Sequence, residues 1–142
     1  MAPASNSSDA APVAPHVLVV DDSRTMRGSV VMTLELAGYR VTSASDGREA
    51  LDHLQRGLRP DLLLTDIVMP GMGGIELIRE ARKRLPSTPI VTLTTQGQRY
   101  LRDEGKTAGA TAWLTKPTGG RELLDMVRQF IAARQSAQQP IG

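Results

Sequence analysis

Short apolar runs alternate with amphipathic segments along most of this chain. The runs that predict strands cover residues 16–20, 40–44, 62–65, 90–93 and 112–114. Helical spacing of apolar residues predicts helices between Ser23 and Gly38 and over residues 47–57, 75–85, 98–108 and about 121–134. Strands that alternate with helices indicate a parallel sheet, and strands that are apolar throughout indicate helices on both faces. We therefore expect an α/β three-layer sandwich with five parallel strands and five helices.

The two ends of the chain differ in composition from its centre. Residues 1–15 are rich in Ala, Pro and Ser and offer little to bury, so we expect a disordered tail there. Residues 135–142 are similar and predict a flexible C-terminal tail. The folded unit then covers residues 16–134, and a chain of 142 residues fits one domain.

Charge and composition disfavour several classes of protein. The 17 basic and 15 acidic residues leave a net charge of +2 without a basic stripe, which disfavours binding to nucleic acid. Cysteine is absent, which excludes disulfides and thiolate metal sites. No apolar stretch approaches the roughly 18 residues that predict a membrane span, and residues 1–15 lack the pattern of a signal peptide. We expect a cytoplasmic protein that does not bind membranes.

Polar residues stand at the ends of the predicted strands. Asp21 and Asp22 follow the first strand, Asp66 the third, Thr94 the fourth and Lys116 the fifth. A lone Asp at a strand end is usually a turn former or a helix cap. Ligands of open parallel sheets, however, bind outside the carboxyl ends of the strands, where the strand order reverses. If the order is 2-1-3-4-5, all five side chains converge on one crevice, which favours a site.

The chemistry of these side chains indicates phosphoryl transfer. Clustered carboxylates repel one another, so they either raise a pKa or recruit a cation, and a few oxygen ligands suit Mg²⁺. Phosphoryl transfer depends mainly on positioning and charge stabilisation, which a cation, the ammonium of Lys116 and the hydroxyl of Thr94 can supply. Asp66 follows the middle strand and can be the carboxylate nucleophile.

Two other groups of residues are interpreted as structural. Gly71, Gly73 and Gly74 lack the spacing of a dinucleotide fingerprint and predict a loop that needs positive φ. His16 and His53 are isolated in the sequence, so we expect exposed side chains and not metal ligands.

Four motifs, in order along the chain, resemble the receiver domains of response regulators. They are VLVVDDSRTMR at 17–27, LLLTDIVMPGMGG at 62–74, IVTLTTQG at 90–97 and GATAWLTKP at 109–117. The resemblance is strongest to the single-domain chemotaxis regulators of the CheY type. It implies that residues 16–134 form a receiver domain with a flavodoxin-like fold and the strand order 2-1-3-4-5.

The resemblance also assigns metal and phosphate chemistry to individual residues. Asp66 matches the phosphoacceptor. Asp22 and Asp66 match the direct Mg²⁺ ligands, and Asp21 matches the residue that holds metal-bound water. The backbone carbonyl of Val68 matches the remaining protein ligand, and Lys116 matches the lysine that pairs with the phosphoryl group.

A switch between two states is implied in the same way. Thr94 matches the switch hydroxyl, and Trp113 stands where the family usually has Tyr or Phe as its rotating aromatic residue. We expect phosphorylated Asp66 to draw Thr94 inward and Trp113 to fill the freed space, which biases the fourth helix and the fifth strand toward a partner. The bond from Lys116 to Pro117 is expected to be cis.

The implied function is that of a stand-alone, monomeric response regulator. A histidine kinase phosphorylates it, and it then binds a target, for which the resemblance suggests a flagellar motor switch protein. One alternative is a phosphate sink that drains the kinase. Another is a small phosphatase with an Asp nucleophile, which would need a substrate cap that these short loops do not offer. A receiver of this type is not an enzyme, apart from assisting its own phosphorylation and dephosphorylation.

Overall fold

The computed structural model of the chain describes residues 13–116 and 119–138. The expected disorder of residues 1–12, the tail residues 139–142 and the predicted cis bond between Lys116 and Pro117 lie outside these residues. Within the described part of the chain, no helix is both long and apolar enough to cross a membrane.

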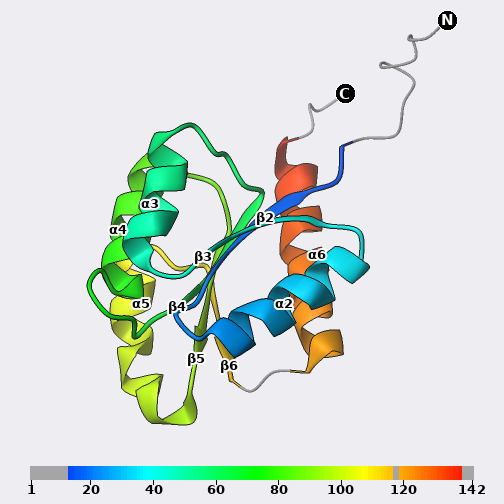
Figure 1. Cartoon of the computed structure of the whole chain (residues 1–142). Coiled ribbons are helices and arrows are strands. Elements are labelled where there is room, and N and C mark those ends of the chain that lie inside the picture. The colour runs from blue at the N-terminus through cyan, green and yellow to red at the C-terminus, as the bar shows by residue number, and fades with distance from the viewer. Residues whose placement is uncertain (1–12, 117–118, 139–142) are drawn as a thin grey trace, which may run out of the picture.

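A five-stranded sheet forms the centre of the fold (Figure 1). Its strands are β2 (His16–Val20), β3 (Arg40–Ala44), β4 (Leu62–Asp66), β5 (Ile90–Thr94) and β6 (Ala112–Thr115). They lie in the order β3-β2-β4-β5-β6, and every neighbouring pair is parallel. Counted along the chain this is the order 2-1-3-4-5, which confirms the expected fold class.

In the described part of the chain, five α-helices and one 3₁₀ helix connect and flank the strands. They are α2 (Arg24–Leu36), α3 (Gly47–Gln55), α4 (Gly74–Arg84), η1 (Gln96–Leu101), α5 (Arg102–Ala108) and α6 (Gly120–Gln138). Figure 1 shows α3, α4 and α5 on one side of the sheet and α2 and α6 on the other. This is the three-layer arrangement that the apolar strands predict.

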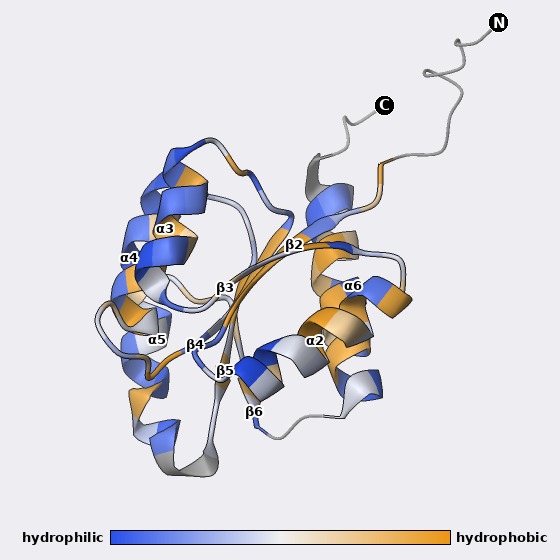
Figure 2. Cartoon of the chain, in the orientation of Figure 1, coloured by the Kyte–Doolittle hydropathy of each residue, from blue (hydrophilic) through white to orange (hydrophobic). Residues whose placement is uncertain are grey.

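Each face of the sheet contributes to its own apolar core. Leu18 and Val20 of β2 pack into the core under α3, α4 and α5, whereas Val17 and Val19 pack into the core under α2 and α6. The alternation follows from the period of two residues along a strand. In Figure 2 hydrophobic colour runs along the central strands and also covers much of α2 and α6. Every residue of β4 and β5 is buried, so both faces of these central strands are covered by packed side chains.

Several element boundaries differ from the sequence prediction. The segment predicted as one helix over 98–108 begins as the 3₁₀ helix η1, where the N–H of Gln98 donates to the carbonyl of Thr95, three residues earlier, at 3.0 Å. Helix α3 ends at Gln55, two residues before the predicted end. Helix α6 runs to Gln138 and so takes in four residues that were expected in the flexible tail. Arg134 of α6 pairs with Asp61 at an N–O distance of 2.7 Å, which holds that end of the helix against the domain.

The expectation of exposed histidines is wrong, because His16 and His53 are both half-buried. His16 Nε2 lies 2.7 Å from the hydroxyl of Thr42, and its backbone N–H donates to Asp61 at 2.8 Å. Burial lowers the pKa of His16, and the nearby charge of Arg40 lowers it further. The pairing of β2 with β3 creates this environment, which no local sequence pattern reveals.

Candidate functional site

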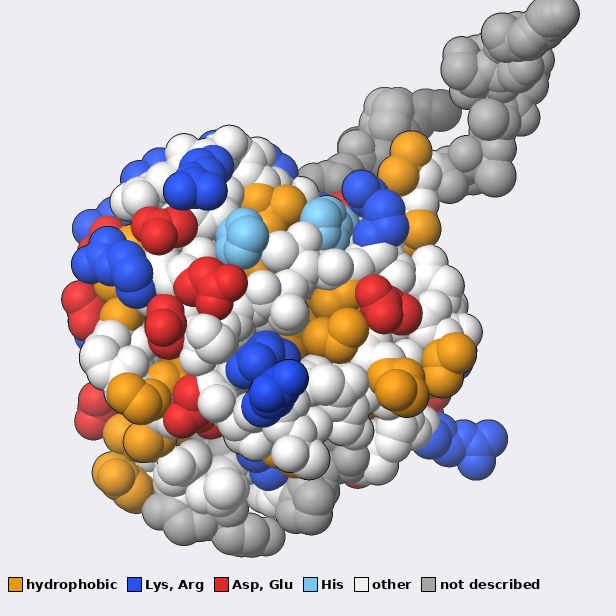
Figure 3. All heavy atoms as spheres, viewed as in Figure 1, with side chains coloured by type: hydrophobic (Ala, Val, Ile, Leu, Met, Phe, Trp, Pro, Cys, Tyr) orange, Lys and Arg blue, Asp and Glu red, His pale blue; other side chains and the backbone are white. Residues whose placement is uncertain are grey.

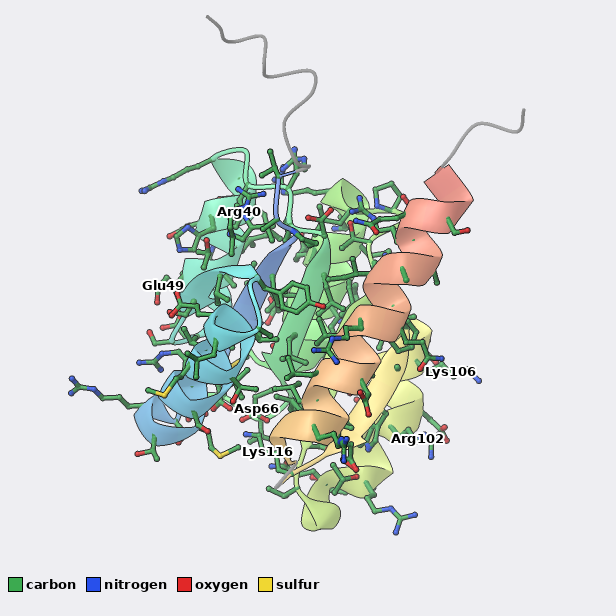
Figure 4. All side chains as sticks on the ribbon, turned by 90° about the vertical axis from the view of Figure 1, so that its right-hand side faces the viewer. Arg40, Glu49, Asp66, Arg102, Lys106 and Lys116 are labelled. Atoms are coloured by element: carbon green, nitrogen blue, oxygen red, sulfur yellow. The ribbon has the colours of Figure 1, made fainter. Side chains whose placement is uncertain are left out.

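The site lies at the carboxyl edge of the sheet, as the strand ends predict. Asp66 and Thr94 are the last residues of β4 and β5, and Asp21 and Lys116 follow β2 and β6 directly. In Figure 4 the labels of Asp66 and Lys116 mark neighbouring side chains at this edge. The structure therefore brings the strand-end residues of four different strands together.

Three aspartates form an acidic cluster. Asp21, Asp22 and Asp66 each offer a carboxylate oxygen, and these oxygens all lie within 4.8 Å of one another. Asp21 and Asp66 are buried, with exposures of 1% and 6%, whereas Asp22 is open to solvent. A set of hard oxygen ligands with one solvent-facing side fits a divalent cation that keeps some of its waters. The cluster could therefore hold a metal ion.

Asp66 sits in a surrounding that favours its neutral form. Burial raises the pKa of its carboxyl group, and the hydrogen bond from Lys116 opposes this shift without cancelling it. The charge of Asp21 adds to the increase. Asp66 Oδ1 accepts the N–H of Ile67 at 2.7 Å, and Oδ2 accepts from Lys116 Nζ at 3.0 Å. An added cation would favour the charged form of Asp66 and so oppose both the effect of burial and the repulsion from Asp21.

Lys116 is the positive charge of the site. Its Nζ lies 3.0 Å from Asp21 Oδ2 and 3.0 Å from Asp66 Oδ2, and its side chain is only 11% exposed. Burial alone would lower the pKa of Lys116, but the hydrogen bonds to the two aspartates outweigh burial and hold the pKa above its ordinary value. The ammonium therefore stays charged and bridges two carboxylates.

Asp21 is fixed through both its backbone and its carboxylate. Its N–H donates to Ala44 O at 3.2 Å, and its Oδ1 accepts the N–H of Ser23 at 2.9 Å. Arg27 Nη1 donates to the carbonyl of Asp21 at 2.7 Å. Sequence reasoning missed Arg27. A cation near the start of a helix is unfavourable because of the helix dipole, so a partner is expected to stabilise it. The position of Arg27 near the start of α2 was therefore the available signal.

Thr94 provides a hydroxyl that the described residues leave without a hydrogen bond. The residue is fully buried, and its Oγ1 has no partner among them. Such a group normally finds a partner, because an unsatisfied buried hydroxyl costs about 1–3 kcal/mol. The backbone carbonyl of Thr94 accepts the N–H of Lys116, which joins the two residues directly. A ligand oxygen arriving at the site could therefore gain a hydrogen bond from Thr94.

The loop after Asp66 owes its shape to a close backbone approach. A Cβ on Gly74 would lie 2.1 Å from the carbonyl oxygen of Asp66, so only glycine fits there. The N–H of Gly74 donates to Ile67 O at 2.7 Å and closes the loop. The prediction of positive φ is right for Gly71 and wrong for Gly73 and Gly74.

Two of the predicted site residues, Val68 and Trp113, lie outside the contacts between the aspartates and Lys116. Val68, two residues after Asp66, has a half-exposed side chain, and the metal-binding role of its carbonyl stays a prediction. Trp113 lies on β6 opposite Thr92 and is half-buried. The position of a Cβ on Gly105 is 3.8 Å from the Trp113 ring, so α5 passes over this side chain. The structure therefore places the Trp113 ring against α5.

The sequence and the fold match known proteins. A family model for the response regulator receiver domain matches residues 17–128, so the chain belongs to the receiver domains of response regulators. This confirms the resemblance carried by the four motifs. Receiver domains take phosphoryl groups from histidine kinases and bind targets, and their fold is typical of signalling regulators.

Individual relatives differ in length. The response regulator MprA of Mycolicibacterium vanbaalenii is 40% identical over 116 residues, which cover 82% of this chain and 50% of that protein. The chain thus spans about half the length of the curated relatives it matches. The chemotaxis response regulator CheY4 of Vibrio cholerae is 41% identical with a TM-score of 0.77, covering 82% of this chain and 98% of that one. A CheY-like receiver domain protein from Methanospirillum hungatei has a TM-score of 0.83 at 28% identity, covering 87% and 98%.

Proposed function

We propose that this chain is a stand-alone response regulator that accepts a phosphoryl group on Asp66, with Mg²⁺, and then binds a target protein. The observation that carries the proposal is the buried Asp66 carboxylate, which shares an acidic cluster with Asp21 and Asp22 and pairs with Lys116. The donor in this proposal is a histidine kinase. The protein is proposed to be cytoplasmic and monomeric, and to catalyse no reaction beyond its own phosphorylation and dephosphorylation.

Each residue of the cluster has a defined part in the transfer. An Asp66 carboxylate oxygen forms a bond to phosphorus while the bond between phosphorus and the imidazole nitrogen of the donor breaks, and that nitrogen keeps the electron pair. Bound Mg²⁺ would supply positive charge to the transferring oxygens. Asp22 and Asp66 would hold the metal directly, together with the carbonyl of Val68. Asp21 would hold metal-bound water, for which its fixed backbone and carboxylate are suited.

The new phosphoryl group would rearrange the hydrogen bonds of the site. Lys116 now bridges Asp21 and Asp66, and its ammonium can pair with a phosphoryl oxygen instead. The unpartnered hydroxyl of Thr94 can donate to another. We infer that Thr94 moves toward the phosphoryl group to make this hydrogen bond. Its movement frees space for Trp113 and so changes the surface of α5 and β6.

That surface carries a pocket, and we propose that the target binds there. The pocket has a volume of about 410 Å³ and is lined by Arg102, Asp103, Lys106, Ala110, Thr111, Ala112 and Trp113. Figure 4 shows Arg102 and Lys106 on the same helix, away from Asp66. The lining has two basic side chains and one acidic side chain, Asp103, beside an indole ring, and this positive balance favours an acidic segment with an apolar anchor. On the face in Figure 3, in contrast, side chains of both charges are intermixed with hydrophobic ones.

Chemotaxis is the proposed output, with a flagellar motor switch protein as the target. The support is the similarity to the chemotaxis regulator CheY4, which the chain covers almost completely. A phosphate sink is the alternative, because the same site would drain a kinase without any target. The two roles differ only in what the phosphorylated chain binds.

A phosphotransfer and binding experiment tests the proposal. The full chain is mixed with a ³²P-labelled chemotaxis histidine kinase, and we expect the label to move to the chain with Mg²⁺ and not after chelation. Asp66→Asn should stay unlabelled, whereas Asp52→Asn, a control on α3, should be labelled. A pull-down with motor switch protein then separates the two roles: retention only of the phosphorylated chain supports the motor role, and no retention supports the sink. A label that reaches Asp66→Asn would refute the assignment of the acceptor.

A further inference from the structure

A half-buried arginine, Arg82, joins the end of α4, the loop that follows it and the end of α5. Arg82 of α4 donates from Nη1 to the carbonyls of Leu85 and Thr88, both at 2.7 Å, and from Nη2 to the carbonyl of Gly109 at 2.6 Å. Burial lowers the pKa of this guanidinium, and no carboxylate pairs with it among the described residues. Its bonds to backbone oxygens therefore take the place of a salt bridge.

Two of these carbonyls belong to helix ends. Leu85 is the C-cap of α4, and Gly109 is the C-cap of α5. Carbonyls at a helix C-terminus lack intrahelical partners and carry a partial negative charge, so a guanidinium stabilises them. The planar fork of arginine can bond to both ends at once, which the ammonium of a lysine cannot reproduce.

The fit around Gly109 is close. Gly109 has φ of +122°, and a Cβ there would lie 3.1 Å from Arg82 Nε and 3.2 Å from Arg82 Cγ. The N–H groups of Gly109 and Ala110 donate to Gly105 O and complete the helix end. The C-terminal end of α5 is thus held both by its own hydrogen bonds and by Arg82.

The opposite end of α5 is more exposed to solvent. It continues from the 3₁₀ helix η1, whose hydrogen-bond geometry is poorer than that of an α-helix, and Tyr100 of η1 is 75% exposed. Midway along α5, Gly105 faces Trp113 and Ile75 at ordinary contact distances, so no side chain of this residue locks the helix in place. Weakly packed segments of this kind open and shift at small free-energy cost.

We propose that Arg82 is a positioning residue that fixes the C-terminal end of α5, so that the switch tilts this helix about Gly109 and moves η1 most. The proposed movement rests on the proposed phosphorylation of Asp66. The clamp itself is a property of the unphosphorylated chain. Because the C-terminal end of α5 is fixed and its η1 end is free, a small shift at Thr94 moves the η1 end. This movement changes the shape of the pocket between α5 and β6.

Hydrogen exchange of the full, unphosphorylated chain tests the clamp. In Arg82→Met we expect the amides of Gly109 and Ala110 to exchange at least tenfold faster than in the wild type, while the Leu63 amide of β4 changes less than twofold. Arg79→Met, which removes an exposed arginine from the same helix, should leave both regions unchanged. Arg82→Lys should give an intermediate increase. Equal acceleration at Leu63 and Gly109, or no acceleration at Gly109, would overturn the clamp.

A phosphoryl mimic tests the tilt. With Mg²⁺ and beryllium trifluoride, we expect exchange at Gln98 of η1 to change at least fivefold in the wild type while Gly109 stays within twofold. In Arg82→Met the Trp113 emission change should fall by at least half, although ¹⁹F NMR shows the mimic bound. A wild type that binds no mimic would count against the proposed function. The hydrogen-exchange rates of the unphosphorylated chain would still show whether Arg82 holds the end of α5. Larger changes at Gly109 than at Gln98 would refute the tilt.

Discussion

Removing the ammonium of Lys116 should destabilise the fold far more than removing the acceptor carboxylate. The Lys116 Nζ lies 3.0 Å from an oxygen of each of two aspartates whose side chains are 1% and 9% exposed. In Lys116→Met both carboxylates keep their backbone hydrogen bonds, from Ser23 and Ile67, but they lose their common cation. Breaking a buried pair in this way costs about 3–5 kcal/mol. We expect the lower end, about 3 kcal/mol of unfolding free energy at pH 7 without divalent ions.

Asp66→Asn should have a different effect on the same cluster. Lys116 keeps its contact with Asp21, and one of two repelling charges is gone. The pKa of Asp66 is raised in the fold, mainly by burial, so the folded chain binds this proton more tightly than the unfolded chain. Stability is therefore lost as pH rises from the ordinary value of 3.8 through the raised pKa, and the loss persists at neutral pH. The variant should lie within about 1 kcal/mol of the wild type or above it.

Urea denaturation followed by far-ultraviolet circular dichroism measures both variants. The buffer contains a chelator, and the midpoints are compared at equal slopes. Adding Mg²⁺ should recover part of the loss in Lys116→Met, because a cation can take the position between the carboxylates. If Asp66→Asn loses as much stability as Lys116→Met, the carboxylates of Asp21 and Asp66 do not repel each other enough to affect the stability of the fold.

Three further expectations concern single residues. Gly74→Ala should lose about 1–3 kcal/mol of stability in urea titrations, because its Cβ meets the Asp66 carbonyl at 2.1 Å. Gly28→Ala is its control, since nothing lies within 4 Å there, and it should gain up to about 1 kcal/mol; equal effects of the two would refute the packing argument. Because the pKa of His16 is lowered in the fold, stability should fall as pH drops below the ordinary value of 6.5. His16→Gln should flatten that pH dependence, and an unchanged slope would contradict the burial of His16. Thr94→Val should keep or raise stability in the unligated chain but abolish the Trp113 response to a phosphoryl mimic, and a retained response would remove Thr94 from the switch.

The sequence predicted the meeting of the strand-end side chains better than the contacts around them, because strand ends can be located from the sequence. Period and polarity mark where a strand ends, and parallel strands bring those ends to one edge. Asp21, Asp66 and Lys116 could therefore be placed together before any coordinates. The strand order came with the family resemblance, since periodicity alone does not define it.

The missed features depend on contacts between distant segments or on close approaches. Arg82 bonds to Gly109, 27 residues away, through a backbone carbonyl that has no sequence signature. Arg27 similarly binds a backbone oxygen. Gly74 was predicted to lie in a loop that needs positive φ, but its role is to let helix α4 approach the backbone of Asp66. Side chains that bind the main chain, and glycines that permit packing, are the features that pattern reasoning detects least.

The intact mass of the chain after incubation with acetyl phosphate tests the central claim most directly. With Mg²⁺ present, the wild type and the Asp52→Asn control should each gain the mass of one phosphoryl group, and fragmentation should locate it on Asp66. Asp66→Asn and a chelated sample should gain nothing. A wild type that stays unmodified, or a modified Asp66→Asn, would contradict the assignment of Asp66 as a metal-assisted phosphoacceptor.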